Sequence, residues 1–511
     1  MASAPQITLG LSGATADDVI AVARHEARIS ISPQVLEELA SVRAHIDALA
    51  SADTPVYGIS TGFGALATRH IAPEDRAKLQ RSLIRSHAAG MGEPVEREVV
   101  RALMFLRAKT LASGRSVRPV VLETMVGMLN AGITPVVREY GSLGCSGDLA
   151  PLSHCALVLM GEGEATDAHG DIRPVPELFA EAGLTPVELA EKEGLALVNG
   201  TDGMLGQLIM ALADLDELLD IADATAAMSV EAQLGTDQVF RAELHEPLRP
   251  HPGQGRSAQN MFAFLADSPI VASHREGDGR VQDAYSLRCS PQVTGAARDT
   301  IAHARLVATR ELAAAIDNPV VLPSGEVTSN GNFHGAPVAY VLDFLAIAVA
   351  DLGSIAERRT DRMLDPARSR DLPAFLADDP GVDSGMMIAQ YTQAGLVAEN
   401  KRLAVPAVDS IPSSAMQEDH VSLGWHAARK LPTSVANLRR ILAVEMLIAG
   451  RALDLRAPLK PGPATGAVLE VLRSKVAGPG QDRFLSAELE AAYDLLANGS
   501  VHKALEAHLP E

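Results

Sequence analysis

Apolar residues recur every three or four positions along most of this chain, the spacing that places them on one face of an α-helix. In the first two hundred residues, the stretches with this pattern are short. A short apolar piece at 55–59 runs into Gly62-Phe63-Gly64 and predicts extended structure instead. The helices predicted in this part cover residues 16–28, 33–49, 75–87, 95–113, 119–130 and 149–159.

After residue 199 the same pattern continues over much longer stretches, which predicts a bundle of long helices. Two or three shorter helices are expected within 466–509. We therefore expect a mainly α protein with a smaller mixed N-terminal domain over 1–199 and a long-helix bundle over 200–511. The long helices are predicted at 204–234, 291–316, 336–359 and 420–455.

Composition supports a helical, self-associating protein. Of the 511 residues, 47% are hydrophobic but only 3% are aromatic, which favours helices packed through small side chains. Such helices offer more apolar surface than one subunit usually buries, so we expect self-association. The net charge of -20 argues against nucleic acid or an anionic membrane as a partner.

The chain also lacks the sequence signals of secretion and membrane insertion. Its N-terminus has no basic segment followed by an apolar one. The strongest apolar run, 338–350, is interrupted by Asp343 and is too short to span a bilayer. We therefore expect a soluble, cytoplasmic protein.

No metal site is expected from the sequence. Cys145, Cys155 and Cys289 are too few and too scattered for a disulfide framework or a CxxC zinc site. The residues around His420 match no HxxEH-type pattern.

The segment 141–151, Gly-Ser-Leu-Gly-Cys-Ser-Gly-Asp-Leu-Ala-Pro, has three glycines within seven positions. Its ordinary interpretation is a turn in which Ser or Asp caps the following helix. A nucleophile elbow is excluded because Asp148 stands where Gly-x-Ser-x-Gly needs a glycine. The wide range of backbone conformations open to glycine could also bring a carbonyl unusually close to a neighbouring amide nitrogen.

That freedom allows the backbone to react with itself at Cys145-Ser146-Gly147. If the nitrogen of Gly147 attacks the carbonyl of Cys145, a five-membered ring closes. Loss of two waters then converts Ser146 into an exocyclic methylidene, an electrophile that no ordinary side chain provides.

Other candidate residues each have a structural alternative. Tyr57 precedes a glycine-rich loop that could act as a lid, or it is a buried aromatic residue. Arg288, in a polar run that is poor helix material, could hold a carboxylate or be a surface charge. Ser86-His87 could bind a polar group or cap a helix, and the acidic run at 416–420 could be an N-cap.

Taken together and in this order, the motifs resemble those of the aromatic amino acid ammonia-lyases over nearly the whole chain. The segments that match this family are 56–58, 61–64, 86–90, 144–152, 197–201, 282–289, 317–319, 331–335 and 417–422.

A dinucleotide-binding site at 62–67 is not favoured, because the glycines there miss the required spacing.

The resemblance implies a prosthetic group, a fold and an assembly. The group is a methylidene-imidazolone formed from Cys145, Ser146 and Gly147, where Cys145 replaces the more usual alanine. No metal and no dissociable cofactor is needed. The fold implied is aspartase/fumarase-like, in a homotetramer whose active sites draw residues from several subunits.

The resemblance also implies roles for individual residues. Tyr57 would remove the β-proton, and Ser146 would carry the electrophilic carbon. Arg288 would hold the substrate carboxylate. Tyr285, a further catalytic candidate, would orient the ring and the amine together with Asn199. Phe333 and Gln282 would line the pocket.

Substrate choice is expected to depend on Ser86, His87 and Glu418. A histidine and a glutamate suit an imidazole, which donates and accepts hydrogen bonds, whereas a phenyl ring would leave them unpaired. Glu418 is thus both a catalytic and a substrate-binding candidate. The reaction expected is the non-oxidative deamination of L-histidine to trans-urocanate and ammonia.

Two alternatives stay open. An aminomutase uses the same ring but returns ammonia to the β-carbon. An inactive helical scaffold would keep the fold without the ring, although such a protein should have lost at least one of Tyr57, Ser146, Arg288 and Glu418.

Overall fold

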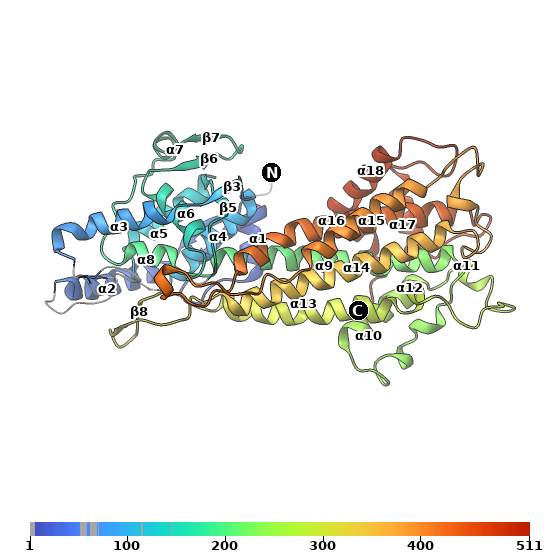
Figure 1. The fold of residues 1–511 in the computed structure, drawn as a ribbon, viewed down its shortest axis with the longest axis horizontal. Coiled ribbons are helices and arrows are strands. Elements are labelled where there is room, and N and C mark those ends of the chain that lie inside the picture. The colour runs from blue at the N-terminus through green and yellow to red at the C-terminus, as the bar shows by residue number, and fades with distance from the viewer. Residues whose placement is uncertain are drawn as a thin grey trace. The chain divides into compact units, whose positions relative to one another are not determined.

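Helices dominate the fold, which was determined as a computed structural model and is shown in Figure 1. The structure describes residues 6–51, 59–61, 69, 71–113, 116–144 and 146–510. The mainly α architecture predicted from the sequence is confirmed. The chain divides into two compact units, and neither is continuous in sequence. Unit 1 comprises Met1–Met210, Ala304–Asp343 and Ala407–Arg429, and unit 2 comprises Ala211–His303, Phe344–Pro406 and Lys430–Glu511.

Unit 1 has short helices around an apolar centre. Helix α4 is buried from Val99 to Leu111, because it packs against α1, α5 and α6. Helix α6 also packs against α3 and α8, so the C-terminal end of the segment that precedes α6 is held in place. The helices are α1 (Ala16–Arg24), α2 (Pro33–Ala50), α3 (Pro73–His87), α4 (Arg97–Leu111), α5 (Pro119–Asn130), α6 (Leu149–Leu159), α7 (Val175–Ala182) and α8 (Glu193–Val198).

The strands of unit 1 form small separate sheets. Strand β1 (Gln6–Leu9) pairs in parallel with β2 (Arg28–Ile31), and β3 (Met91–Pro94) pairs antiparallel with β5 (Arg138–Tyr140). In the remaining antiparallel sheets, β6 (Glu164–Thr166) lies between β4 (Thr134–Pro135) and β7 (Ile172–Pro174), and β8 (Val320–Val321) pairs with β9 (Val327–Thr328).

Four long helices contribute residues to both units. They are α9 (Asp202–Ala232), α13 (Ser290–Leu312), α14 (Ala336–Leu364) and α16 (Gly424–Asp454). Each corresponds to a predicted long helix, with ends that differ by up to five residues. Unit 2 also contains α10 (Pro252–Phe264), α11 (Pro269–Ala272), α12 (Tyr285–Arg288), α15 (Met387–Leu403), α17 (Pro463–Arg473), α18 (Leu485–Ala497) and α19 (Ser500–Leu505).

A buried polar network joins the long helices within unit 2. The guanidinium of Arg359 on α14 donates to the carboxylate of Glu445 on α16, with Nη2 at 2.9 Å from Oε2. Thr225 and Ser229 on α9 donate to the same carboxylate at 2.9 and 2.8 Å, and Arg359 also donates to Ser290 on α13. Because both ions are buried, removing either Arg359 or Glu445 would leave the other charge without compensation.

Two local predictions are wrong in detail. The helix predicted from residue 420 begins at Gly424, because Ser422 and Leu423 donate hydrogen bonds to the 141–148 segment before the helix starts. The acidic residues at 418–419 therefore precede the helix and do not cap it. The polar run at 282–289 contains a short helix, α12, despite its composition. The extended segment predicted at 55–59 lies outside the described residues, except Ile59, which is in a turn.

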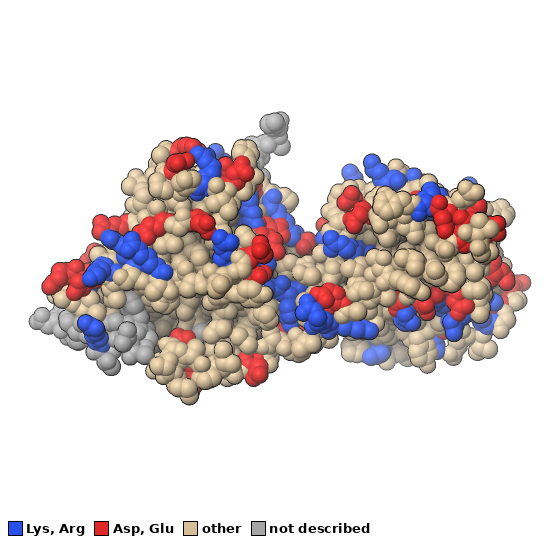
Figure 2. Space-filling view, turned by 45° about the horizontal axis from the view of Figure 1, so that its top comes forward, with Lys and Arg blue, Asp and Glu red and all other residues tan. Residues whose placement is uncertain are grey.

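Helix α14 contains the apolar run 338–350 and is longer than that run. Among the described residues, it is the helix long and apolar enough to cross a membrane by length and composition. However, 61% of its apolar window is buried inside the protein, as is usual for a core helix. On the face shown in Figure 2, acidic and basic side chains are interspersed.

Candidate functional site

The segment between β5 and α6 has a conformation that only glycine accommodates at residue 147. Gly147 has a φ of 75°, in the left-handed region. A Cβ atom at this position would lie 2.0 Å from the carbonyl oxygen of Gly200. The absence of a side chain at Gly147 is therefore required by close packing against a second backbone segment.

This segment is held by hydrogen bonds from three distant parts of unit 1. The amide of Asp148 donates to the carbonyl of Gly200 at 2.7 Å. The carbonyl of Gly144 accepts from the amide of Gly335 at 3.1 Å and from the hydroxyl of Ser422 at 2.9 Å. Its conformation thus depends on residues that are far away in sequence.

Asp148 joins the candidate ring segment to the start of α9. Its Oδ2 accepts from the amides of Gly203 and Met204 at 2.8 and 2.9 Å, and its Oδ1 accepts from Ser142. Complete burial raises the pKa of Asp148 to about 7, although these donors favour the ionised form. The sequence suggested Asp148 as the cap of its own helix, but its side chain makes no cap bond to α6 and binds α9 instead. The signal in the sequence was an acidic residue directly before an apolar helix.

Ser146 and Glu418 are brought together by the fold. The hydroxyl of Ser146 donates to Oε1 of Glu418 at 3.2 Å, across 272 positions of sequence. Glu418 lies in a short bridged turn with Ser413, whose hydroxyl donates to Oε2 at 3.1 Å. Both side chains are half-buried. Cys145 and Tyr57 lie outside the described residues, so their predicted roles stay predictions.

Asn199 is buried and adjoins the same segment. It ends α8, and its Nδ2 donates to the carbonyl of Leu195 at 3.2 Å. Its own carbonyl accepts from Nη1 of Arg107 at 2.9 Å, and Arg107 forms a buried ion pair with Asp202. The next residue, Gly200, is the one packed against Gly147, so Asn199 and the ring segment share a rigid support.

Ser86 and His87 end helix α3. The Ser86 hydroxyl donates to the carbonyl of Leu83 at 3.0 Å, and Nδ1 of His87 lies 2.9 Å from the same carbonyl. These are the contacts expected of the helix-capping alternative. The amide of Gly90 then donates to Nε2 of His154 on α6 at 3.1 Å, which attaches the turn after His87 to the helix that follows the ring segment.

Phe333 lies half-buried in the loop before α14, two residues from the Gly335 amide that binds Gly144.

The other predicted site residues lie in unit 2. They are Gln282, Tyr285 and Arg288. The ring of Tyr285 is 72% exposed, and the Arg288 guanidinium lies 4.7 Å from its centroid. Gln282 is exposed as well.

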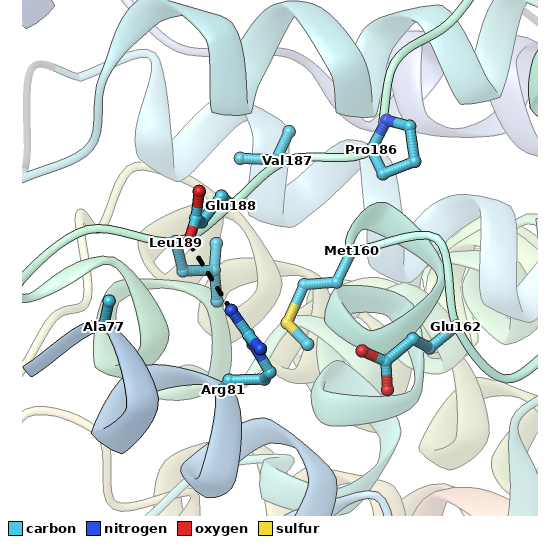
Figure 3. A pocket seen from close by; sticks show the side chains of 8 residues that line it. All are labelled: Ala77, Arg81, Met160, Glu162, Pro186, Val187, Glu188 and Leu189. Carbon is cyan, nitrogen blue, oxygen red and sulfur yellow. Dashed lines mark hydrogen bonds and ion pairs between the residues drawn. The ribbon is translucent and has the colours of Figure 1, made fainter. Parts of the chain in front are cut away.

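A separate pocket of about 300 Å³ lies in unit 1 (Figure 3). Two of its lining residues, Arg81 and Glu188, form an ion pair, and none of the candidate residues is among those that line it. Among the described residues, no group of three or more His, Cys, Asp or Glu could hold a metal ion. The lining residues are Ala77, Arg81, Met160, Glu162, Pro186, Val187, Glu188 and Leu189.

Comparison with known proteins identifies a close set of relatives. The family described as aromatic amino acid lyase matches residues 14–474. A protein of Streptomyces avermitilis named histidine ammonia-lyase is 67% identical, over 98% of this chain and 98% of its own.

Solved structures share the fold over nearly the full length. The histidine ammonia-lyase of Trypanosoma cruzi is similar with a TM-score of 0.91 and 38% identity, covering 99% of this chain and 96% of that chain. The tyrosine aminomutase of Streptomyces globisporus is similar with a TM-score of 0.94 and 36% identity, covering 99% of each chain. The aspartase/fumarase-like helical fold implied by the sequence resemblance is thereby confirmed.

Proposed function

Because this chain belongs to the aromatic amino acid lyase family, we propose that it deaminates L-histidine to trans-urocanate and ammonia, the reaction of a histidine ammonia-lyase. The observation that carries the proposal is the contact between Ser146 and Glu418. It joins the residue expected to become the electrophile to the carboxylate expected to recognise an imidazole.

The residues present fit the methylidene-imidazolone group. Ring closure needs a residue without a side chain at 147, and the cradle formed by Gly200 admits only glycine there. The group would be formed by Cys145, Ser146 and Gly147. Once formed, it supplies an electrophilic carbon that bonds to the substrate amine and makes nitrogen a better leaving group.

Glu418 and His87 account for the choice of substrate. In the proposed complex, the Glu418 carboxylate accepts a hydrogen bond from the imidazole N–H of histidine, and His87 offers a second polar contact. A phenyl ring satisfies neither group, and an unpaired buried polar group costs about 1–3 kcal/mol. Ser86 holds the end of α3 in the conformation that presents His87.

The remaining roles rest on the family resemblance. Tyr57 removes the β-proton, for which its phenol needs a pKa below the usual value of about 10. Arg288 binds the substrate carboxylate through paired hydrogen bonds. Tyr285 and Asn199 orient the ring and the amine. The pocket is lined by Gln282 and Phe333.

We further propose that the active protein is a homotetramer in the cytoplasm, with active sites completed by neighbouring copies. Apolar side chains in unit 2 are exposed in pairs three positions apart on two helices, as an interface requires. They are Phe344 and Ile347 on α14, at 44% and 48% exposure, and Ile388 and Tyr391 on α15, at 52% and 60%.

The test is an assay of the purified protein with L-histidine, L-tyrosine and L-phenylalanine, with ultraviolet detection of the corresponding acrylates. We expect urocanate from histidine, an intact mass lower than the sequence mass by two waters, and loss of both in Ser146→Ala. Activity on tyrosine alone, or a β-amino acid product as from an aminomutase, would overturn the proposal. An unchanged mass without activity would favour an inactive scaffold.

A further inference from the structure

Two histidines with no role assigned so far connect the loop that carries Phe333 to the loop that carries Glu418. The rings of His334 and His420 are stacked, with centroids 5.3 Å apart and planes inclined by 30°. Nε2 of His334 lies 3.3 Å from Nδ1 of His420 and 3.3 Å from the carbonyl oxygen of His420.

The hydrogen bonds determine where the ring protons are. The amide of Ala336, the first residue of α14, donates to Nδ1 of His334 at 3.3 Å, so this nitrogen carries no proton. The neutral ring of His334 then has its proton on Nε2, from which it donates to the carbonyl and Nδ1 of His420. Nδ1 of His420 acts as an acceptor, and its proton is on Nε2. The arrangement uses both rings in the neutral form.

The histidine pair is a second contact between two loops that already meet at Gly144. In the first contact, the carbonyl of Gly144 accepts hydrogen bonds from Gly335 and Ser422. Gly335 directly follows His334, and Ser422 comes two residues after His420. Glu418 comes two residues before His420, so its position next to Ser146 depends on both contacts.

We propose that His334 and His420 are positioning residues that hold the Glu418 loop against the Ser146 loop, and that protonation of either imidazole releases this hold. The inference rests on the proposed function, in which Glu418 binds the substrate ring. It adds a pair of residues and a pH dependence to that site.

The charged side chains on the segments that meet at the pair have partners of their own or are exposed. On the His420 segment, Glu418 accepts from Ser146 and Ser413, and Asp419 is exposed. On the 141–148 segment, Asp148 is bound to Ser142 and to the start of α9. The segment 331–336 has no titratable side chain besides His334.

Protonation would place two donors against each other. A proton on Nδ1 of His334 would face the amide of Ala336, and a proton on Nδ1 of His420 would face Nε2–H of His334. Because lowering the pH protonates imidazoles, the hold should weaken on acidification.

Two variants of one residue separate the hydrogen bond from the ring. His334→Gln keeps an N–H donor near the place of Nε2 and does not titrate, whereas His334→Phe keeps a ring without a donor. At about pH 8.5, where imidazoles are neutral, we expect His334→Phe to lose about tenfold in kcat/KM for histidine through misplacement of Glu418. His334→Gln should stay within about twofold of the native protein, since its donor is retained.

The pH profile gives the sharper comparison. When the pH is lowered from about 8.5 to about 6, across much of the range in which imidazoles change charge, the rate of the native protein relative to His334→Gln should fall toward that of His334→Phe relative to His334→Gln. Titrations that all three proteins share, such as that of the substrate, cancel in these ratios. His169→Gln and His169→Phe, at an exposed histidine in the β6–β7 turn, are the matched controls and should follow the native profile. A native rate and profile in His334→Phe would overturn the inference and leave the proposed function intact.

Amide hydrogen exchange tests the same hold without activity. After correction for the intrinsic effect of pH, residues 331–336 and 413–423 of the native protein should lose protection between about pH 8 and 6, the imidazole range. The same segments in His334→Gln should not. If the native protein makes no urocanate, the proposed function fails and this measurement still decides the role of the pair. Equal protection of these segments in the native protein and in His334→Phe, at both pH values, would overturn the proposed role of the pair. If His334→Phe does not fold, a native-like loss of protection at low pH in His334→Gln would also overturn it.

Discussion

The carbonyl oxygen of Gly200 occupies the place where residue 147 would carry a Cβ atom, 2.0 Å from its ideal position. Gly147→Ala must therefore displace one of two backbone segments, and its φ of 75° adds further strain. We expect this variant to keep the full sequence mass, without loss of two waters, and to lose deamination. Intact-mass measurement and the urocanate assay check this.

Gly255→Ala is the matched control for that substitution. Gly255 lies inside α10, and a Cβ there meets nothing within 4 Å. The control should be processed and active, with stability unchanged or raised by about 0.5–1 kcal/mol. A fully processed Gly147→Ala protein would contradict the proposed cradle.

Replacing Glu418 by glutamine should change the choice of substrate more than the capacity for reaction. Before the ring forms, the amide oxygen can still accept from the Ser146 hydroxyl. In the mature site, the charge proposed to pair with the imidazole N–H is lost. Since hydrogen bonds to charged groups contribute about 1.5–3 kcal/mol, we expect kcat/KM for histidine to fall about 10- to 100-fold.

The ratio of rates on phenylalanine and histidine should rise in Glu418→Gln, as measured by parallel assays of cinnamate and urocanate. Asp419→Asn, at the neighbouring exposed carboxylate, should leave this ratio unchanged. An equal loss on both substrates would show that Glu418 acts in the chemical step and not in ring recognition.

His154 should make the stability of the protein depend on pH. Burial lowers the pKa of His154, and the nearby Arg138 lowers it further. Nε2 accepts from the Gly90 amide, so the folded protein needs the neutral form. Below about pH 6.5, the usual imidazole value, the unfolded chain binds more protons than the folded chain. This part of the stability is thus present above that pH and lost as the pH falls below it.

In His154→Gln, the amide oxygen can accept from Gly90 without titrating. The midpoint of thermal unfolding should therefore fall less between about pH 8 and 5.5, either side of the imidazole value, than in the native protein. His169→Gln should retain the native dependence. If His154→Gln and the native protein fall in parallel, His154 does not contribute as described.

Glu445→Gln should strongly destabilise the long-helix bundle of unit 2. It leaves the buried guanidinium of Arg359 without a counter-charge, a change that typically costs about 3–5 kcal/mol. Thermal unfolding followed by circular dichroism measures the loss. Glu399→Gln, in an exposed ion pair with Arg402, should have little effect.

The double replacement Arg359→Met with Glu445→Leu distinguishes charge from packing. It removes both charges together, and should therefore be closer to the native stability than Glu445→Gln alone. If both proteins are destabilised equally, packing and not charge is the cause.

The long helices could be predicted from the sequence because their apolar period extends over many turns, as in α9 and α14. The start of α16 could not, since it is set by bonds from Ser422 and Leu423 to a segment hundreds of residues earlier. The two-residue strands β4 and β8 have too little sequence to show any pattern.

The candidate site was predictable only in part. The glycines at 144 and 147 indicated unusual backbone freedom, but not which segment would require it. No spacing rule brings Glu418 to Ser146, and only the order of motifs suggested that they act together. Asp148 was visible as a helix cap, and its attachment to α9 depends on tertiary structure that local sequence does not specify.

The bonds at Gly144 have a consequence for biosynthesis. A ribosome makes residues 141–148 early, but the donors to the Gly144 carbonyl, Gly335 and Ser422, are made much later. A nascent chain that stops before these residues has the reactive tripeptide without its clamp. If closure of the ring depends on that clamp, the protein matures only after Ser422 of its 511 residues has been synthesised, and chains that end before Ser422 stay chemically inert.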